Sequence, residues 1–587
     1  MAYAGDARED AEPTPQDAAA ANPPQDPSAE HSLQEDVSDE LVVDNAEKSI
    51  ERSRSKILLI MLALGCTVFL HALDVTIIAT ALPTITESFH SEAAYTWIGS
   101  AYLLAIAATT IVWSKVSDVF GRKPVLLLTI VIFFIGSLIA ALSINIGMLI
   151  AARAIQGCGG GGLNVLVNVC IGDLFSPRRR GTYYSIIGGV WAVALSLGPI
   201  VGGILTQRVS WRWCFYLNLP FDGLAFIIIV LFLDLKTPKT AFVEGISAID
   251  WVGAFLSVGG TILLLFGLSS GGETYPWNSA TVVCLIVFGI VCWVLCFFWE
   301  IHLAKYPILP VRIFRHRSSL AALGICFIQS YVYFAATYYL PLYFQAVLGV
   351  TPILSGLYLL PTALSVSVAS TAAGIYMRKT GQYVAAIWIG LVLQTLGYGL
   401  FIDLGPTANW AKIIFQVVAG LGVGPNFQAP LVALQSFSSP RDVATVTSAT
   451  VFTRNLGGSI SVVIGQVVFQ NEMSKRQGIL AAALGPQLAA RLGGGAAGAN
   501  TEVIRTLPPG QRDVVHTVFT ESLRCVWIMY TAFSAAGLAI CFLVGNNKLS
   551  RDHKETKTGL EAEEEARQER MQEEQDRKGV KASKTEA

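Results

Sequence analysis

Fourteen long apolar segments, separated by short polar stretches, restrict the fold of this chain more than any other feature. Each is close to the roughly 20 apolar residues that an α-helix needs to cross a bilayer. Helices satisfy their own backbone hydrogen bonds, as a segment inside lipid must do. The sequence therefore predicts an all-α polytopic membrane protein. Its spans lie near 57–82, 93–113, 124–144, 147–171, 182–205, 215–235, 251–270, 279–301, 319–341, 352–374, 385–403, 410–435, 445–468 and 523–545.

The charged residues are few and gather at the two ends of the chain. They make up 14% of the 587 residues, whereas soluble domains carry about 25%. Residues 1–56 are acidic and rich in Pro and Ala, without apolar periodicity, which predicts a disordered tail. Residues 546–587 form a second polar tail, in which Glu, Gln and Arg are frequent.

The Lys and Arg residues of the short loops orient the spans. The loops on the opposite side offer only Arg208 and Arg212, so the basic side is expected to be cytoplasmic. With 14 spans both termini are then cytoplasmic, and the long 471–521 segment is an extracytoplasmic loop. The residues that mark the cytoplasmic side are Lys115, Arg122, Lys123, Arg178, Arg179, Arg180, Lys236, Lys239, Lys305, Arg312, Arg315, Arg317, Arg378, Lys379 and Arg441.

The sequence also repeats itself. The segment RAIQGCGGGG at 153–162 aligns with QVVAGLGVGP at 416–425, and SKVSDVFGRKP at 114–124 aligns with GIYMRKTGQY at 374–383. We therefore expect a six-helix bundle at 57–235, two inserted spans with a linker at 236–318, and a second six-helix bundle at 319–545. Parallel repeats of this kind build transporters with a binding site near the middle of the membrane.

Two charges in the spans of the first half have uncharged counterparts in the second. Asp74 lies in the first span and Arg153 in the fourth, where Gln416 is its repeat counterpart. Ionisable residues inside a membrane are costly and indicate function. At 1.5 Å per residue their depths differ by about one helical turn, so they can pair. We expect Asp74 and Arg153 to form a proton-coupling pair, with a static ion pair as the alternative, and no other acid of this half to lie as deep.

Polar side chains elsewhere in the spans are candidates for a substrate cavity. In the fourth span Arg153, Gly157, Gly160, Asn164 and Asn168 recur at helical spacing, which predicts a polar stripe that faces protein or water. The glycines equally permit close helix packing, and both interpretations can hold. The cavity candidates are Gln156, Asn164, Asn168, Gln329, Tyr333, Gln416, Asn426 and Arg454.

Two further motifs predict moving parts. Asp118 and Arg122 are four residues apart, as in a pair on one helical turn, and Gly121 permits a tight bend. With Asp173 they predict a charged gate at the cytoplasmic end. In the fifth span a proline is expected to kink the helix and glycines to admit a neighbouring helix; these residues are Gly198, Pro199, Gly202 and Gly203.

Taken together, these motifs resemble those of the major facilitator superfamily, and within it the fourteen-span drug:proton antiporters. The resemblance covers residues 57–545 and rests on LDVTIIATALP at 73–83, SKVSDVFGRKP, RAIQGCGGG, LGPIVGG at 197–203 and WRWCFYLNLP at 211–220. It implies proton-driven efflux of small hydrophobic or amphipathic compounds (toxins, secondary metabolites or drugs) from the cytoplasm, with Arg153 linked to proton transfer. Ser114 departs from the usual glycine, so we expect a slightly looser helix contact there.

Other functions remain open or are disfavoured. A vacuolar basic-amino-acid or siderophore transporter of the same fold is the main alternative, and a membrane sensor without transport is a distant one. The chain has no G-x-x-x-x-G-K-[ST] loop for ATP, and its 7 His and 10 Cys show no metal spacing. We expect no enzyme activity, cofactor, metal or nucleic acid, and a monomer whose partners are lipid, protons and a small molecule. The plasma membrane is the expected location, with the vacuolar membrane as the alternative.

Overall fold

The computed structural model describes residues 54–89, 93–235, 238, 240–272, 275–309, 311–314, 316–405, 411–439, 442–492, 501–550, 559–561, 564, 565 and 568. The predicted disordered tail at 1–56 therefore falls almost wholly outside the described residues, as does most of the tail at 546–587. The chain divides into two units, Met1–Leu58 and Leu59–Ala587. In the first unit only the start of one helix is described, and the architecture below is that of the second.

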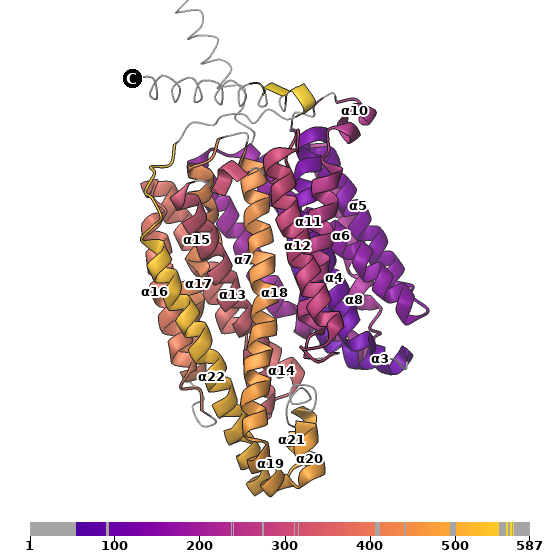
Figure 1. Cartoon of the computed structure of the whole chain (residues 1–587), viewed down its shortest axis with the longest axis vertical. Coiled ribbons are helices and arrows are strands. Elements are labelled where there is room, and N and C mark those ends of the chain that lie inside the picture. Colours follow the sequence, from indigo (N-terminus) through magenta and orange to yellow (C-terminus); the bar gives the residue numbers. More distant parts are fainter. Residues whose placement is uncertain are drawn as a thin grey trace, which may run out of the picture. The chain divides into compact units, whose positions relative to one another are not determined.

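Fourteen of the described helices are long and apolar enough to cross a membrane (Figure 1), which confirms the predicted fold class. The first six spans are α2 (Arg54–Ile77), α4 (Ala93–Phe120), α5 (Arg122–Ala141), α6 (Ile146–Leu174), α7 (Pro177–Arg208) and the pair α8 (Trp213–Tyr216) and α9 (Asn218–Phe232). Two more are α11 (Trp251–Ser270) and α12 (Ala280–His302). The last six are α13 (Arg317–Ala346), α14 (Pro352–Leu357) with α15 (Leu360–Thr380), α16 (Val384–Phe401), α17 (Ala411–Ser436), α18 (Val443–Lys475) and α22 (Pro509–Cys541).

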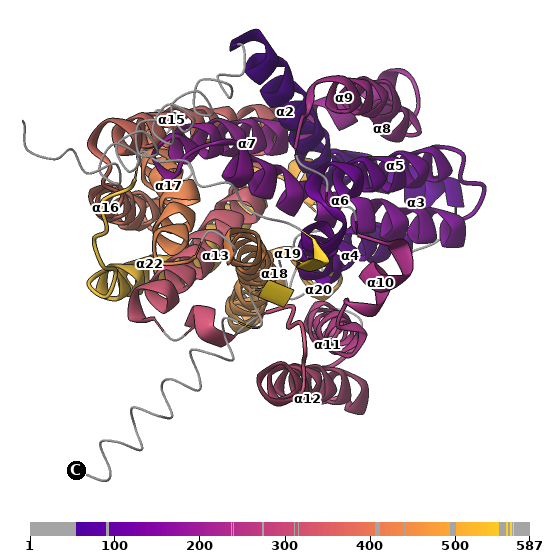
Figure 2. The same cartoon turned by 90° about the horizontal axis from the view of Figure 1, so that it is seen from above.

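Seen along the helices, the first six spans and the last six form two groups, and α11 and α12 lie at the side of α4 (Figure 2). We call the end of the helices at which Gly121, Arg178 and Gly381 lie the basic end, and the other the opposite end. The short helix α10 (Phe242–Ser247) lies at the basic end. The described residues include no β-strand, only an isolated bridge between Gly271 and Tyr275.

The internal repeat is visible in how α6 and α17 pack. A Cβ on Gly159 would lie 2.5 Å from the backbone nitrogen of Phe133 on α5, and one on its counterpart Gly422 would lie 2.0 Å from that of Gln394 on α16. Each glycine thus lets its helix touch the backbone of the helix before it. α6 packs between α4 and α5 as α17 packs between α15 and α16. The repeat read from the sequence therefore has the same register in space.

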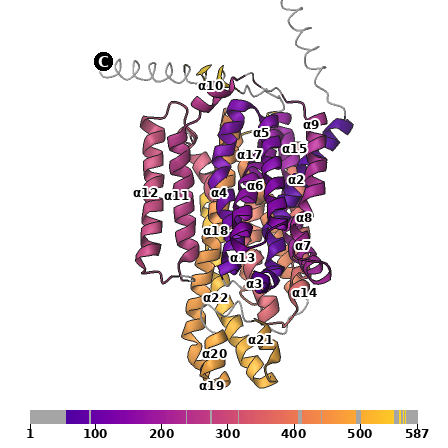
Figure 3. The same cartoon turned by 90° about the vertical axis from the view of Figure 1, so that its right-hand side faces the viewer.

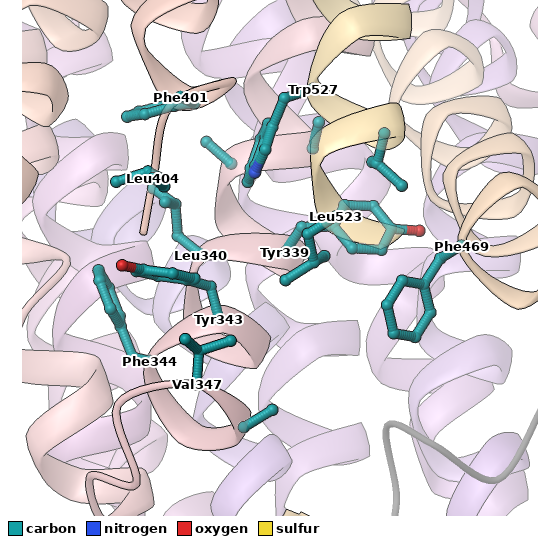
Figure 4. Packing of buried hydrophobic residues seen from close by; sticks show 14 of the residues in the cluster. Tyr339, Leu340, Tyr343, Phe344, Val347, Phe401, Leu404, Phe469, Leu523 and Trp527 are labelled. Carbon is teal, nitrogen blue, oxygen red and sulfur yellow. The ribbon is translucent and has the colours of Figure 1, made fainter. Parts of the chain in front are cut away.

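The second group of spans has an aromatic core near the opposite end (Figure 4). Tyr339 and Tyr343 of α13 face Phe401 and Trp527 of α16 and α22, all at most 5% exposed. Their hydroxyl groups donate to backbone carbonyl oxygens, Tyr339 to Val462 (3.0 Å) and Tyr343 to Gly405 (2.6 Å). The buried tyrosine hydroxyls thus have hydrogen-bond partners and no charge is needed, so this part of the bundle is a packed core.

The segment 471–521, which we expect to be an extracytoplasmic loop, is largely helical where it is described. α18 and α22 each have 33 residues, about 50 Å at 1.5 Å per residue, and so exceed the roughly 30 Å hydrocarbon layer. Three short helices lie between them in the sequence, at the far ends of α18 and α22 (Figure 3): α19 (Gln477–Leu484), α20 (Pro486–Leu492) and α21 (Thr501–Thr506). Arg476 links both long helices through Glu472 (2.6 Å) and Glu521 (3.0 Å). Residues 493–500 lie outside the described part of this segment.

Candidate functional site

The two predicted membrane charges meet as a buried ion pair. Nη1 of Arg153 on α6 donates to Oδ2 of Asp74 on α2, and each side chain is 1% exposed. Nε of Arg153 donates to the carbonyl oxygen of Ile98 on α4 (3.1 Å). The guanidinium therefore holds three helices together at one depth, with all three of its nitrogens donating.

A polar network surrounds this pair. Oε1 of Gln156 accepts from Nη1 of Arg153 (2.6 Å), and Nε2 of Gln156 donates to Oγ of Ser137 on α5 (2.9 Å). Nδ2 of Asn218 on α9 lies 3.2 Å from the same Ser137 hydroxyl and 3.3 Å from Oδ1 of Asp74. Asp74 is thus bonded from both α6 and α9. Gln156, predicted as a cavity residue, is instead committed to this network.

Aromatic rings exclude water from the pair. The ring of Tyr102 on α4 lies 4.0 Å from Cζ of Arg153, and that of Phe215 lies 5.8 Å away. The Tyr102 hydroxyl donates to the carbonyl of His71 (3.1 Å) and lies 2.8 Å from its Nδ1. Because these rings replace water, charges in the site interact strongly.

A second acid lies at this site, which the sequence interpretation missed. Asp222 of α9 is 0% exposed, so the expectation that no other acid of this half lies as deep as Asp74 is wrong. Its position inside the apolar segment at 215–235 was the available signal, since an acid there is rare and costly. The network residues Ser137 and Asn218 also went unnoticed, because small polar side chains are common in membrane helices.

The glycines of α6 are packing residues. A Cβ on Gly157 would lie 2.4 Å from the carbonyl oxygen of Tyr102, and one on Gly160 would lie 2.7 Å from Nδ1 of His71. The predicted stripe therefore faces protein. At its far end Asn168 donates to the carbonyl of Asn164 (2.8 Å), and its own carbonyl accepts from Tyr184 on α7 (3.1 Å).

The proline of the fifth span is compensated by a residue of the first. Pro199 has no N–H for the carbonyl of Leu195, one turn earlier in α7. Oγ1 of Thr76 on α2 donates to that carbonyl instead (2.9 Å). A Cβ on Gly198 would lie 2.0 Å from the Thr76 hydroxyl, and one on Gly202 would lie 2.1 Å from the carbonyl of Ile77. The motif thus fits α7 against α2 two residues from Asp74, with Gly203 buried beside it.

The three charged gate residues are also brought together. Nη1 of Arg122 lies 2.5 Å from Oδ1 of Asp118, and its Nε lies 2.8 Å from Oδ2 of Asp173. Arg122 is only 2% exposed. Gly121 has φ +93°, which L side chains rarely adopt, and it alone separates α4 from α5. All four residues belong to the first six spans, so this cluster braces the ends of α4, α5 and α6 rather than joining the two groups of spans.

The two groups of spans are joined at the basic end by other residues. Arg178 on α7 donates to the carbonyl oxygens of Arg378 (2.7 Å) and Lys379 (2.5 Å) at the end of α15. The sequence interpretation used Arg178 only as a loop charge. Ser114 on α4 donates to the carbonyl of Ala444 on α18 (3.1 Å) and is buried, so it also joins the two groups of spans.

Further bonds between the two groups lie in the same half of the helices. The described hydrogen bonds of this kind begin at Ser114 and Arg178 and reach no further along α7 than Gly189. They join Thr182 to Gly374 (3.2 Å), Ser370 to Ser185 (3.2 Å), Ser367 to Gly189 (2.9 Å) and Gln435 to Tyr184 (3.0 Å). The described hydrogen bonds between the two groups therefore lie towards the basic end.

The cavity candidates of the second half are distributed between the centre and the helix interfaces. Phe427 of α17 packs on Tyr333 of α13, with ring centroids 5.8 Å apart, and its carbonyl accepts from Nη2 of Arg454. Gln329 is 1% exposed and both of its amide atoms lack a partner among the described residues. Phe427 also lies against Gly188 of α7. Phe427 therefore lies where both groups of spans meet.

Two candidates are instead held in helix interfaces. Gln416 accepts from Thr362 (2.9 Å) and donates to the carbonyl of Lys412 (3.1 Å). The Asn426 amide, turned so that both of its atoms are satisfied, bonds the Ile387 carbonyl and the Leu391 amide of α16. Both therefore have structural partners already.

Comparisons with known proteins agree with this architecture. The model of the Major Facilitator Superfamily matches residues 64–462. The MFS-type transporter ppz2 of Metarhizium majus is 66% identical over 92% of this chain and 93% of its own length. Efflux pump dotC of Dothistroma septosporum is 55% identical over 87% and 88%. The solved structure of the proton:xylose symporter XylE is similar in fold, with a TM-score of 0.52. The alignment covers 88% of this chain and 100% of that structure, at 13% identity.

Family match, relatives and fold lead to one conclusion: this chain belongs to the major facilitator superfamily and is a membrane transporter, not an enzyme.

Proposed function

We propose that the protein exports small hydrophobic or amphipathic molecules from the cytoplasm in exchange for protons. The observation that carries this proposal is the ion pair of Asp74 and Arg153, buried at 1% exposure in a site where a carboxyl group can exchange its partner for a proton. Relatives named efflux pumps support the direction of transport. The basic end is the cytoplasmic end by the positive-inside rule.

The exchange uses two opposing effects on one carboxyl group. Burial favours its neutral form, and a neighbouring guanidinium favours its charged form. Asp74 is paired and the two groups of spans are bonded to each other at the basic end, an arrangement that we assign to the state before the proton arrives. Protonation of Asp74 from the extracytoplasmic side would release Arg153, and return of the pair would expel the proton to the cytoplasm. Arg153 stays charged throughout.

The proposed substrate contacts lie in the second half. Phe427 and Tyr333 offer aromatic faces, and Gln329 offers an amide whose atoms have no partner among the described residues. Arg454 lies beside them, with Cζ 5.1 Å from the Phe427 ring. This mixture suits molecules with a large apolar body and a few polar groups. We propose that the protein binds such a molecule as its cargo, and that it acts as a monomer in the plasma membrane.

The test is export of the amphipathic dye rhodamine 6G from reconstituted vesicles with a trapped pH indicator. We expect Asp74→Asn to abolish dye transport driven by a pH gradient, because the amide cannot carry a proton. Asp250→Asn is the matched control: Asp250 caps α11 by accepting from Gly253 N (2.9 Å), and Asn caps equally well. Wild-type protein that moves no protons with the dye, or full export by Asp74→Asn, would contradict the proposal.

A further inference from the structure

Asp222 is the one carboxyl group of this site that lacks a partner. Both of its oxygens are buried and accept no hydrogen bond from the described residues. The four hydrogen bonds of the Arg153 guanidinium go to Asp74, Gln156 and the Ile98 carbonyl, and none goes to Asp222. An ionised carboxylate without donor or counter-ion is among the most expensive groups to bury.

The charges of the site cannot balance unless one carboxyl group is neutral. Asp222 lies one helical turn from Asn218, whose amide is 3.3 Å from the Asp74 carboxylate, so the two carboxyl groups are close enough to interact. A single guanidinium, Arg153, compensates one of them. Two neighbouring carboxylates do not both ionise readily. Because Asp74 has the ion pair, the proton belongs on Asp222.

Asp222 also lies on the side from which a proton would leave. It follows Asn218, the residue that contacts Asp74, by one turn of α9, about 6 Å along the axis. α9 runs towards the basic end, since Lys123 at that end donates to the carbonyl of Val230 (2.9 Å). Asp222 is therefore nearer to the cytoplasmic side than Asn218.

We propose that Asp222 is a second proton-binding site on the transport pathway, which holds the proton while Asp74 is paired with Arg153. The inference rests on the proposed proton-coupled export. A proton from the extracytoplasmic water binds Asp74 and frees Arg153. Asp222 then releases its proton towards the cytoplasm, and its carboxylate is compensated by Arg153. Transfer of the proton from Asp74 to Asp222 restores the starting state, so one proton enters and one leaves.

The other groups around Asp222 do not replace it. α5 packs along α9, but its only charged residues, Arg122 and Lys123, stand at the basic end. The Arg153 guanidinium is bound to Asp74. The titratable groups near Asp222 or near the pair of Asp74 and Arg153 are Cys66, His71 and Asp74 of α2, Tyr102 of α4 and Cys214 of α8. Asp74 is the single carboxyl group among them.

The first test reads protonation directly and needs no substrate. Infrared spectra of the purified protein are recorded for wild type, Asp222→Asn and Asp74→Asn, and the spectrum of each variant is subtracted from that of wild type. We expect Asp222→Asn to remove a carbonyl stretching band of a protonated carboxyl group, and Asp74→Asn to leave that band in place. Thermal unfolding of each variant verifies that it is folded. A wild-type band that survives in folded Asp222→Asn overturns the inference.

The second test reads coupling, with rhodamine 6G as the probe. Asp222→Asn is expected to slow dye transport driven by a pH gradient by about 100-fold. Dye exchange at equal pH, which needs no net proton movement, should persist, and Asp222→Glu should recover part of the coupled rate. Coupled transport at the wild-type rate by Asp222→Asn would overturn the inference and leave the proposed function standing. Wild type that moves no protons with the dye would overturn both, while the infrared spectra still report the protonation of Asp222.

Discussion

At the scale of single residues, the site around Arg153 depends on a close contact between α6 and α4 that leaves no room for a side chain at Gly157. Gly157 brings α6 so close to α4 that a Cβ there would meet the Tyr102 carbonyl oxygen at 2.4 Å and the Ala105 Cβ at 2.8 Å. Tyr102 in turn lies against the Arg153 guanidinium. The position of the Arg153 charge therefore depends on Gly157, one turn later in α6, having no side chain.

Gly157→Ala should consequently destabilise the protein by about 2 kcal/mol, as overpacking of a close contact does, and should reduce dye export. The measurement is thermal unfolding of purified protein together with vesicle transport. Gly65→Ala is the matched control in α2, because nothing lies within 4 Å of its Cβ position; it should be neutral or more stable by roughly 0.5–1 kcal/mol. Equal stability of the two variants would show that the contact does not constrain the site.

At the scale of helices, the kink of α7 is held by its neighbour. The carbonyl of Leu195, which Pro199 leaves without its usual donor, is satisfied by Thr76 at 2.9 Å. Thr76 lies two residues from Asp74, so the bend of α7 and the depth of the ion pair are fixed by the same stretch of α2.

Thr76→Val keeps the shape of the side chain but leaves the Leu195 carbonyl unpaired, which should cost about 1–3 kcal/mol. We expect lower thermal stability and slower coupled export. Thr80→Val is the control, since Thr80 donates only within its own turn, to Ile77 at 3.4 Å. If both variants unfold at the same temperature, the bond to α7 does not stabilise the kink.

At the scale of the whole molecule, hydrogen bonds at the basic end join the two groups of spans. Arg178 makes two of them, to the Arg378 and Lys379 carbonyls. The charged cluster around Arg122 lies within one group, so it braces that group and does not join the two groups.

Removal of Arg178 should therefore favour opening at the basic end. In Arg178→Ala, spin labels at Arg179 and Gln382, both exposed, should show a longer distance by pulsed electron resonance. Each lost bond to a charged donor is worth about 1.5–3 kcal/mol, enough to change the populations of two states visibly. Lys123→Ala is the control, because Lys123 bonds Val230 within the first group. An unchanged distance distribution in Arg178→Ala would exclude it from the closure.

The sequence predicts the spans, the repeat and the central pair well, because each follows from local chemistry. Apolar length predicts a span, and a charge inside a span demands a partner, which leads from Asp74 to Arg153. The bond between Thr76 and Leu195 could not be predicted, since it joins residues 119 positions apart. The bonds of Arg178 to α15 were missed because the positive-inside rule already explains a basic residue at the end of a span. The helices α19–α21 were missed because each is short, and because the apolar segment of α18 that precedes them has no sharp end in the sequence.

The distribution of contacts around Asp74 has a consequence for how such proteins diversify. Every described hydrogen bond to the Asp74 carboxylate comes from α6 or α9, and the supporting bonds come from α4 and α5. None comes from the half that contains Phe427, Tyr333 and Arg454. Substitutions in the later helices can therefore alter the proposed cargo contacts of a descendant protein, while the hydrogen bonds that hold the pair of Asp74 and Arg153 are inherited unchanged.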